Sequence, residues 1–204
     1  MPRKPKQKRS KETVQAIVQA GFIAIARHGR DGATTRHIAD IAGVSVGTLY
    51  EYFSNKEEVF AAMLESFVQE LVGVLEPRIP DLVRMEIKDV IVDLMYQFKE
   101  LMERDDGLYL KCAPYTVQVD PKVQLKPLET LLMDIFMQYV IHNPENMQIR
   151  DLSTMSYIMM NGAVFTIIRY LIKPPSNISF EQLAAGLGNM VAGYVAEERR
   201  EQAV

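Results

Sequence analysis

Cysteine and histidine are scarce in this chain of 204 residues, which contains one cysteine and three histidines. A lone Cys112 cannot form a disulfide within the chain, and this fits a reducing cytoplasm. His28, His37 and His142 lie far apart, with no Ser-His-Asp order, metal-ligand spacing or phosphate-cradling glycine loop beside them. We therefore expect no catalytic residue, metal or cofactor. Because Cys112 stands on an apolar segment, we expect it to pack; a redox sensor is the alternative.

Long hydrophobic runs are also absent. The longest apolar stretch, from Tyr157 to Ile168, is interrupted by Asn161 and Gly162 and is too short to span a bilayer. The apolar segment 14–26 follows basic residues, as in a signal peptide, but polar residues interrupt it and its apolar side chains follow helical spacing. The sequence therefore predicts a soluble, cytoplasmic protein with no membrane partner.

The alternation of apolar and polar residues that marks a β-strand is not found in any convincing form. With 48% hydrophobic residues, the chain can bury a substantial core. Helical spacing continues after Phe53 and is divided by prolines and glycines. Helices are expected over about residues 55–76, 82–104, 108–113, from 121 or 127 to 142, over 151–172 and from 179 onward. We expect an all-α fold of about nine helices.

The formal net charge is −3, but the charges are unevenly distributed. Residues 1–60 carry ten Lys and Arg against six Asp and Glu, whereas residues 61–204 carry thirteen against twenty. The first eleven residues include six basic side chains and no acid. Such a basic arm, with Lys8 and Arg9 within it, suits contact with DNA phosphates or entry into a minor groove. A disordered solubilising tail is the alternative.

The stretch Thr34–Phe53 has the pattern of two short helices joined by a turn. Ile38 and Ala39 fall on one face of the first helix, and Gly43 supplies the conformation that ends it. Ser45 is a natural N-cap for the second helix. This is the pattern of a helix-turn-helix, whose second helix lies in the DNA major groove. A helical hairpin with no DNA role is the alternative. Downstream, Ser54-Asn-Lys-Glu57 has capping-box spacing and is expected to open a further helix.

The segment from about Val14 to Phe60 resembles the DNA-binding domain of the TetR (tetracycline-repressor-like) family of bacterial regulators. The resemblance runs through Thr34-Thr-Arg-His-Ile-Ala, Ala42-Gly-Val-Ser-Val-Gly-Thr-Leu-Tyr-Glu-Tyr-Phe53 and Lys56-Glu57, and covers roughly a quarter of the chain. It implies a DNA-binding domain at residues 1–56 and a helical ligand-sensing and dimerisation domain at residues 57–204.

Roles in DNA binding follow from position in the motif. Thr35 and Arg36 open the helix before the recognition helix and are expected to contact phosphate. Four residues lead the recognition helix and are expected to meet base edges: Ser45, Val46, Gly47 and Thr48. Tyr50 and Tyr52 match family positions that reach the sugar-phosphate backbone, although core packing is the alternative for Tyr52. Lys56 is expected to add its charge to a helix N-terminus beside a phosphate.

The resemblance implies that the second domain holds a ligand pocket. Methionines and aromatics at helical spacing could line it together with a few polar groups, although such stripes also form ordinary cores. The candidate pocket residues are Phe67, Met95, Phe98, Met102, Tyr109, Cys112, Met159, Asn161 and Phe165. Because few charges interrupt these faces, the ligand is expected to be largely apolar, aromatic or acyl-chain-like.

The last two helices are expected to form a homodimer interface, as they do in the family. Small residues on the final helix permit close approach of another helix, although packing within the chain explains them nearly as well. The candidate interface residues are Ile168, Ile172, Ala185, Gly188, Ala192 and Ala196.

These expectations combine into a ligand-responsive regulator of transcription. It is expected to be a dimeric repressor, released from a palindromic operator in double-stranded DNA by an apolar small-molecule inducer. The helix at about 55–76 would carry the movement between the domains. An activator of the same fold and a helical adaptor protein are the alternatives.

Overall fold

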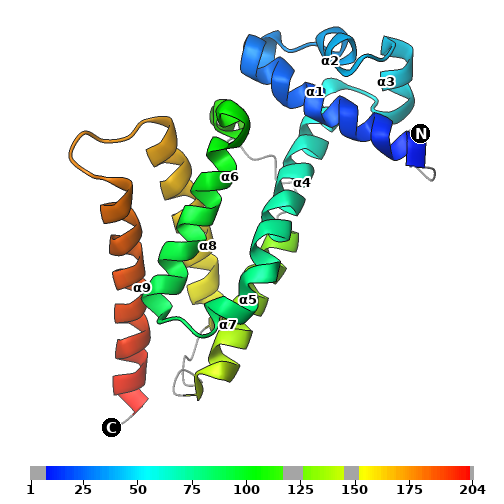
Figure 1. Ribbon diagram of the computed structural model, residues 1–204. Helices are drawn as coiled ribbons and strands as arrows, with labels where there is room; N and C mark the ends of the chain where they lie inside the picture. The colour runs from blue at the N-terminus through cyan, green and yellow to red at the C-terminus, as the bar shows by residue number, and fades with distance from the viewer. Residues whose placement is uncertain (1–7, 117–125, 145–151, 203–204) are drawn as a thin grey trace. The chain divides into compact units, whose positions relative to one another are not determined.

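A computed structural model describes residues 8–116, 126–144 and 152–202 of the chain (Figure 1). The elements are α1 (Lys8–Gly32), α2 (Thr35–Ala42), α3 (Val46–Tyr52), α4 (Lys56–Leu75), the 3-10 turn η1 (Glu76–Arg78), α5 (Ile79–Leu82), α6 (Ile87–Thr116), α7 (Lys126–His142), α8 (Leu152–Ile172) and α9 (Phe180–Gln202). No strand occurs in these described ranges, and the predicted all-α fold class is confirmed. The predicted number of nine helices is approximate, since short turns and a broken helix blur the count.

Four helix boundaries follow from capping residues. Gly43 ends α2 in the left-handed conformation, and Ser45 caps α3, both as predicted. At the start of α9, Ser179 and Gln182 form a reciprocal capping box, with N···O distances of 2.8 and 3.1 Å. The box predicted at Ser54-Asn-Lys-Glu57 is displaced by one residue: Asn55 Oδ1 accepts from the Glu58 amide, and a Glu58 carboxylate oxygen accepts from the Ser54 amide.

The helix predicted to begin near residue 82 begins instead at Ile87. Leu82 and Val83 are buried in the preceding turn. The break predicted at residues 105–107 is present as an interruption inside α6, where Asp105, Asp106 and Gly107 all have positive φ. Within the described residues α7 begins at Lys126, so Pro127 lies in its first described turn, where a proline removes no helical hydrogen bond. The alternative start at residue 121 lies outside the described residues.

The chain forms two compact units, one of Met1–Val68 with Met102–Gln124 and the other of Gln69–Leu101 with Leu125–Val204. These limits differ from the boundary expected after residue 56. The reason is that the first turns of α4 and the end of α6 pack with α1. The Tyr109 ring lies edge-on to the rings of Phe22 and Phe67, at centroid distances of 4.9 and 5.0 Å. The Cys112 thiol, beside them, lies 3.4 Å from the Phe22 carbonyl oxygen.

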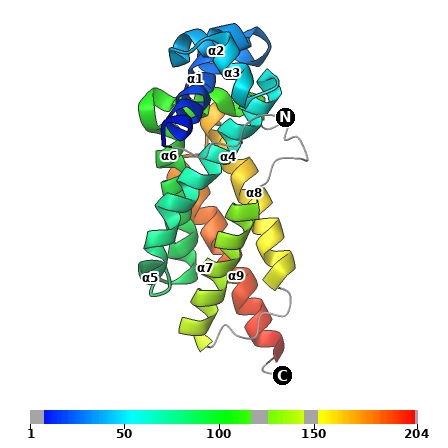
Figure 2. The same ribbon diagram turned by 90° about the vertical axis from the view of Figure 1, so that its right-hand side faces the viewer.

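The second unit is a helical bundle. Figure 1 and Figure 2 both show α7, α8 and α9 as long helices lying roughly along one direction. The bundle is held by apolar side chains and by a two-armed ion pair, in which the Arg78 guanidinium donates to both carboxylate oxygens of Asp93 at 3.1 and 2.5 Å. Asn143 also donates to the Val83 carbonyl at 3.0 Å, which ties α7 to the turn after α5.

A close contact inside this bundle accounts for Gly188. A Cβ atom at this position would lie 2.8 Å from the Lys88 carbonyl oxygen of α6, and 3.4 Å from a methyl of Val92. No real Cβ approaches a backbone atom so closely, so a side chain here would push α9 away from α6. The small residue is therefore required by packing within the chain.

We expect Gly188→Ala to lower the free energy of unfolding by about 1–3 kcal/mol, because the added methyl overpacks this contact. The matched control is Gly73→Ala on α4, where nothing lies within 4 Å of an added Cβ. That change should raise stability by about 0.5–1 kcal/mol through helix propensity alone. Urea unfolding followed by circular dichroism measures both, and equal stabilities of the two variants would contradict the assigned contact.

One stretch of the described chain, Ser153–Ile172 in α8, is long and apolar enough to cross a membrane by length and composition, with a mean hydropathy of 1.3. We expected the apolar run from Tyr157 to Ile168 to be too short for a membrane span, but α8 continues through Asn161 and Gly162, and the apolar stretch is longer than that run. A single helix of this kind is weak evidence of a membrane span. Only 12% of the stretch is buried, and an exposed apolar face also marks a helix that packs against another protein.

Candidate nucleic-acid interface and helical cavity

The helices α2 and α3 follow one another as a short pair in the first unit (Figure 1). The Thr34 hydroxyl accepts from the His37 amide at 3.2 Å and caps α2, a role that the sequence analysis missed although a threonine directly before a helix indicates it. The turn is closed at Gly43 by its φ of 68° and ψ of 30°, which glycine adopts without steric cost. Ile38, Ala39 and Leu49 are completely buried between the helices. These buried side chains therefore fix the orientation of α3 relative to α2.

The four residues predicted to meet base edges lie at the start of α3. Ser45 and Gly47 are exposed, and Val46 and Thr48 are half-buried. The Ser45 hydroxyl accepts from the Thr48 amide at 2.9 Å and also lies 2.9 Å from the Thr48 hydroxyl. If either hydroxyl contacts DNA, it does so while it is also hydrogen-bonded to the other hydroxyl. An added Cβ at Gly47 would meet only the Ser45 hydroxyl oxygen, at 3.6 Å, so the outer surface of this turn is open.

Three of the predicted backbone-contacting residues surround this turn. The hydroxyls of Thr35 and Tyr50 lie 3.3 Å apart, so the first turn of α2 and the middle of α3 present one polar surface. The Tyr50 side chain is 50% exposed and Arg36 is exposed beside Thr35, whereas Tyr52 is half-buried. The structure thus brings Thr35 and Tyr50 together, leaves Arg36 exposed on α2, and places Tyr52 partly in the core.

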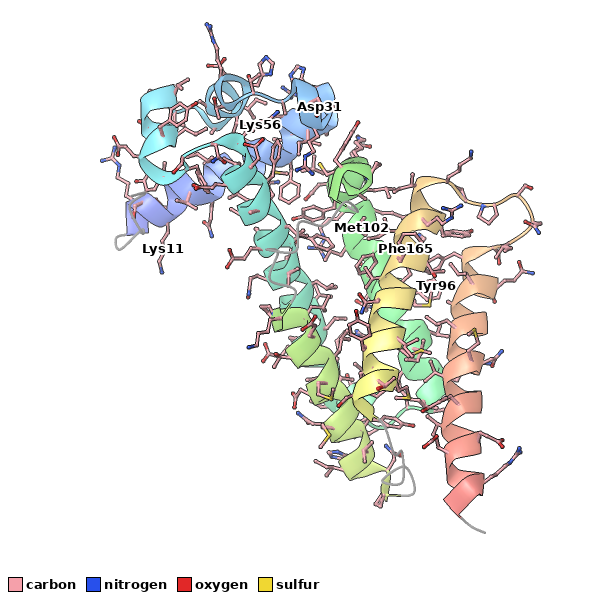
Figure 3. The ribbon with its side chains drawn as sticks, turned by 180° about the vertical axis from the view of Figure 1, so that it is seen from behind. Lys11, Asp31, Lys56, Tyr96, Met102 and Phe165 are labelled. Atoms are coloured by element: carbon pink, nitrogen blue, oxygen red, sulfur yellow. The ribbon has the colours of Figure 1, made fainter. Side chains whose placement is uncertain are left out.

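Lys56 has a different environment from the one expected. Its ammonium nitrogen lies 3.4–3.5 Å from the carbonyl oxygens of Arg30, Asp31 and Ala33 and 6.0 Å from the centre of the Phe60 ring. Figure 3 shows Lys56 at the start of α4, near Asp31 at the end of α1. The positive charge therefore sits against carbonyl oxygens at and just beyond the end of α1. Whether it also contacts phosphate stays a prediction.

A second basic residue supports the same corner. Arg30 donates to the Tyr115 carbonyl at 2.8 Å, and its guanidinium lies 5.7 Å from the centre of the Phe60 ring. This link joins the end of α1 to the end of α6 across 85 residues of sequence. Sequence reasoning missed it, because neither residue carries a local signal for the contact.

The predicted basic arm is described only in part. Arg9 and Lys11 are exposed in the first turn of α1. Lys8 is the first residue of that helix, and its side chain is outside the described residues, as are positions 3, 4 and 6. The role of the arm stays a prediction.

The histidines and the cysteine show no arrangement for catalysis in the described ranges. His37 stacks on His28 at a centroid distance of 4.4 Å, which places it against α1 and not on the open surface. Burial raises the pKa of the Cys112 thiol to about 12, so this sulfur is not a thiolate at neutral pH. Among the described residues, no group of three or more His, Cys, Asp or Glu could hold a metal.

A cavity lies inside the second unit. The space open to the centre of a water molecule is about 80 Å³. Its lining comes from α4, α6, α7, α8 and α9, and includes three of the predicted pocket residues, Met95, Phe98 and Met159. The lining residues that sequence reasoning missed are Leu71, Leu75, Ile91, Leu94, Leu128, Leu132, Phe136, Ser156, Ala163, Val164, Ile167 and Leu187.

The other predicted pocket residues lie elsewhere. Phe67, Tyr109 and Cys112 belong to the first unit, with their contacts around Phe22, and Met102 is buried there too. The Asn161 amide donates to the Tyr157 carbonyl of its own helix at 2.8 Å. Phe165 is 54% exposed. The structure therefore does not bring the predicted set together around one cavity.

The predicted dimer residues also occupy different environments. Gly188 is buried against α6, as described above. Ala185, Ala192 and Ile168 are half-buried, and Ala196 and Ile172 are exposed. The large apolar side chains left exposed on the last two helices include Tyr157, Ile158, Phe165, Ile172, Met190 and Tyr194. Ile158, Phe165 and Ile172 repeat every seven residues and so form one stripe on α8.

Comparison with known proteins concerns mainly the first unit. Residues 17–63 match the model of the bacterial regulatory proteins of the tetR family. The nucleoid occlusion factor SlmA of Actinobacillus pleuropneumoniae is 33% identical over 73 residues, which are 36% of this chain and 35% of that protein. The HTH-type transcriptional regulator PksA of Bacillus subtilis is 38% identical over 68 residues, 33% of each chain. The chain thus spans about a third of the length of these curated relatives.

Structural similarity to solved proteins extends over most of the chain. The solved structure of the fatty acid degradation regulator FadR from Bacillus halodurans has a TM-score of 0.69 to this chain at 19% identity, covering 88% of this chain and 97% of that chain. Both units therefore have the fold of this group of regulators.

Proposed function

Because the chain belongs to the TetR family of bacterial transcriptional regulators and carries the family's DNA-binding domain, we propose that it acts as a dimeric repressor. It would bind a palindromic operator through α3 of each copy and leave it when an apolar small molecule enters the second unit. Its DNA target places it in the cytoplasm.

One observation carries the DNA-binding part of this proposal. The outer surface at the start of α3 is open at Gly47, while Ile38, Ala39 and Leu49 hold the helix on α2 from the inside. A helix supported in this way can enter a major groove with its first turn leading. The hydroxyls around it suit contacts with phosphates and base edges.

Two copies would give the affinity that one reading helix lacks, because two half-sites are read at once. The exposed stripe Ile158, Phe165 and Ile172 on α8, with Met190 and Tyr194 on α9, supports a dimer through these helices. Such a dimer would also bury the exposed apolar side chains along α8.

The coupling between ligand and DNA would run through two helices. Residues of both α4 and α6 belong to each compact unit. In the second unit, Leu71 of α4 and Met95 of α6 line the cavity; in the first, the part of α6 after the break carries Tyr109, which packs on Phe22. A ligand that favours one position of these helices by about 1–3 kcal/mol would change DNA affinity by about 5- to 150-fold.

Selection of binding sites from a random duplex pool tests the proposal. We expect a palindrome with two half-sites, and an affinity for it that falls steeply with salt as phosphate contacts release counterions. An activator would recover a palindrome too, and a promoter-fusion assay in a deletion strain then separates it from a repressor. A chain that enriches no sequence and shows little binding to DNA at low salt would instead be a helical adaptor.

A further inference from the structure

The described lining of the cavity in the second unit is almost entirely apolar. Among its described lining residues only Ser156 is not apolar, and no ionisable side chain takes part. Leu75 of α4, Phe98 of α6 and Phe136 of α7 are typical of the remaining walls. The chemistry of this space is therefore that of a hydrocarbon with a single hydroxyl in its wall.

The Ser156 hydroxyl is buried and unpaired. The residue is 8% exposed, and its Oγ has no hydrogen-bond partner. A serine inside a helix commonly bonds back to the carbonyl one turn earlier, but the structure holds no such bond here. A buried hydroxyl without a partner is destabilising, so its presence in an apolar wall calls for a partner that arrives from outside.

Water is a poor partner at this place. A buried water molecule needs about two to four polar groups to hold it. Ser156 supplies only one, and the rest of the described lining supplies none. This lining is therefore poorly suited to hold an ordered water molecule.

We propose that the cavity binds an uncharged amphiphile, a mainly apolar molecule with one neutral hydrogen-bonding group that pairs with the Ser156 hydroxyl. This inference rests on the ligand-binding role proposed above and names the chemical class of the ligand. A hydroxyl can both donate and accept, so an alcohol, an ester or a ketone satisfies it equally. Each further polar group on the ligand would be left without a partner.

Charged ligands are excluded by the same lining. A carboxylate entering this space would lose its hydration and gain one hydrogen bond, and none of the described lining residues carries a positive charge to balance it. The cavity should therefore separate an acyl ester or a long-chain alcohol from the free acid of the same chain length.

Displacement of the uncharged fluorescent probe N-phenyl-1-naphthylamine measures this selectivity, and the chain contains no tryptophan to interfere with its emission. We expect decan-1-ol and methyl decanoate to displace the probe from the full chain. Decanoate at pH 8 should do so about 100-fold more weakly or not at all, because its charge has no partner. Equal competition by decanoate and decan-1-ol would overturn the proposal.

The role of the hydroxyl is tested by Ser156→Ala, with Ser153→Ala as the matched control, since Ser153 is exposed on the same helix. In Ser156→Ala, decan-1-ol should bind about 2- to 10-fold more weakly, the effect of one lost hydrogen bond. Butylbenzene, which has no hydrogen-bonding group, should bind as before, and the ligand-free variant should melt no lower than the wild type. A parallel loss of both ligands would mean a damaged cavity and would overturn the role of Ser156.

Binding to the selected DNA is measured in the same samples, so that the two proposals can fail separately. If the chain binds its DNA but no amphiphile displaces the probe, the ligand class proposed here is wrong and the DNA-binding role stands. If decan-1-ol binds as described but leaves DNA affinity unchanged, the ligand class stands and the release mechanism is wrong.

Discussion

Replacing Gly47 by glutamate is expected to remove specific DNA binding while leaving the fold intact. A Cβ at this position has free space apart from the Ser45 hydroxyl at 3.6 Å, so a longer side chain extends outward from the first turn of α3. There it would place a carboxylate against the phosphates and acceptor-rich base edges of the groove. Because a like-charge contact in an interface costs several kcal/mol, we expect affinity for the selected operator to fall about 100-fold or more.

The control for this change is Gly47→Ala. Alanine fits the same space and improves helix propensity by about 1 kcal/mol, so it should unfold at the same or a higher temperature and bind DNA within a few-fold of the wild type. Fluorescence anisotropy with a labelled operator gives the affinities, and thermal unfolding followed by circular dichroism checks the fold of both variants. Wild-type affinity in a folded Gly47→Glu protein would show that α3 does not enter the groove.

Within the DNA-binding head, formed by α1, α2 and α3, the features that the sequence predicted correctly are those that depend on residues close together in the chain. Gly43 and Ser45 act within one turn of the chain, through backbone conformation and through a hydrogen bond to an amide three residues away. The displaced cap shows the limit of such patterns, since Ser54 and Asn55 are both good capping residues and the geometry of the incoming chain selected Asn55.

The environment of Lys56 could not be predicted in the same way. Its partners are carbonyls at and just beyond the end of α1, more than twenty residues earlier. A sequence pattern does not show which helix end lies beside which side chain. The resemblance indicated a phosphate contact from position alone. The structure adds that the ammonium already has a place within the head, where it stabilises the corner between α1 and α4.

The residues predicted to line one pocket fall in two different compact units, and the sequence could not show this division. Helical spacing puts Met95, Phe98 and Met102 on one stripe of α6, but the division of the chain into two compact units falls between Leu101 and Met102. Residues on one stripe therefore serve different units. Ser156 was not noticed, because a single serine in an apolar helix has no pattern of its own; only its burial and its missing partner distinguish it.

The apolar surface of α8 and α9 leads to the second large effect. In one copy of the chain, Phe165 is 54% exposed and Met190 is 66% exposed. If a second copy covers them, a carboxylate at either position would be buried without a partner in the dimer yet fully hydrated in the monomer. We therefore expect the double variant Phe165→Glu and Met190→Glu to be monomeric at concentrations where the wild type is a dimer.

Sedimentation velocity measures this against the 23.2 kDa mass of one chain. The matched control is Ile141→Glu, which changes a residue of α7 that is 62% exposed and lies outside the proposed interface. This control should remain dimeric and bind the operator as the wild type does. The double variant should lose about 100-fold or more in operator affinity, since each head must then bind its half-site alone. A double variant that remains dimeric would place the interface on another surface, whereas a monomer with full operator affinity would show that the two heads are not linked through α8 and α9.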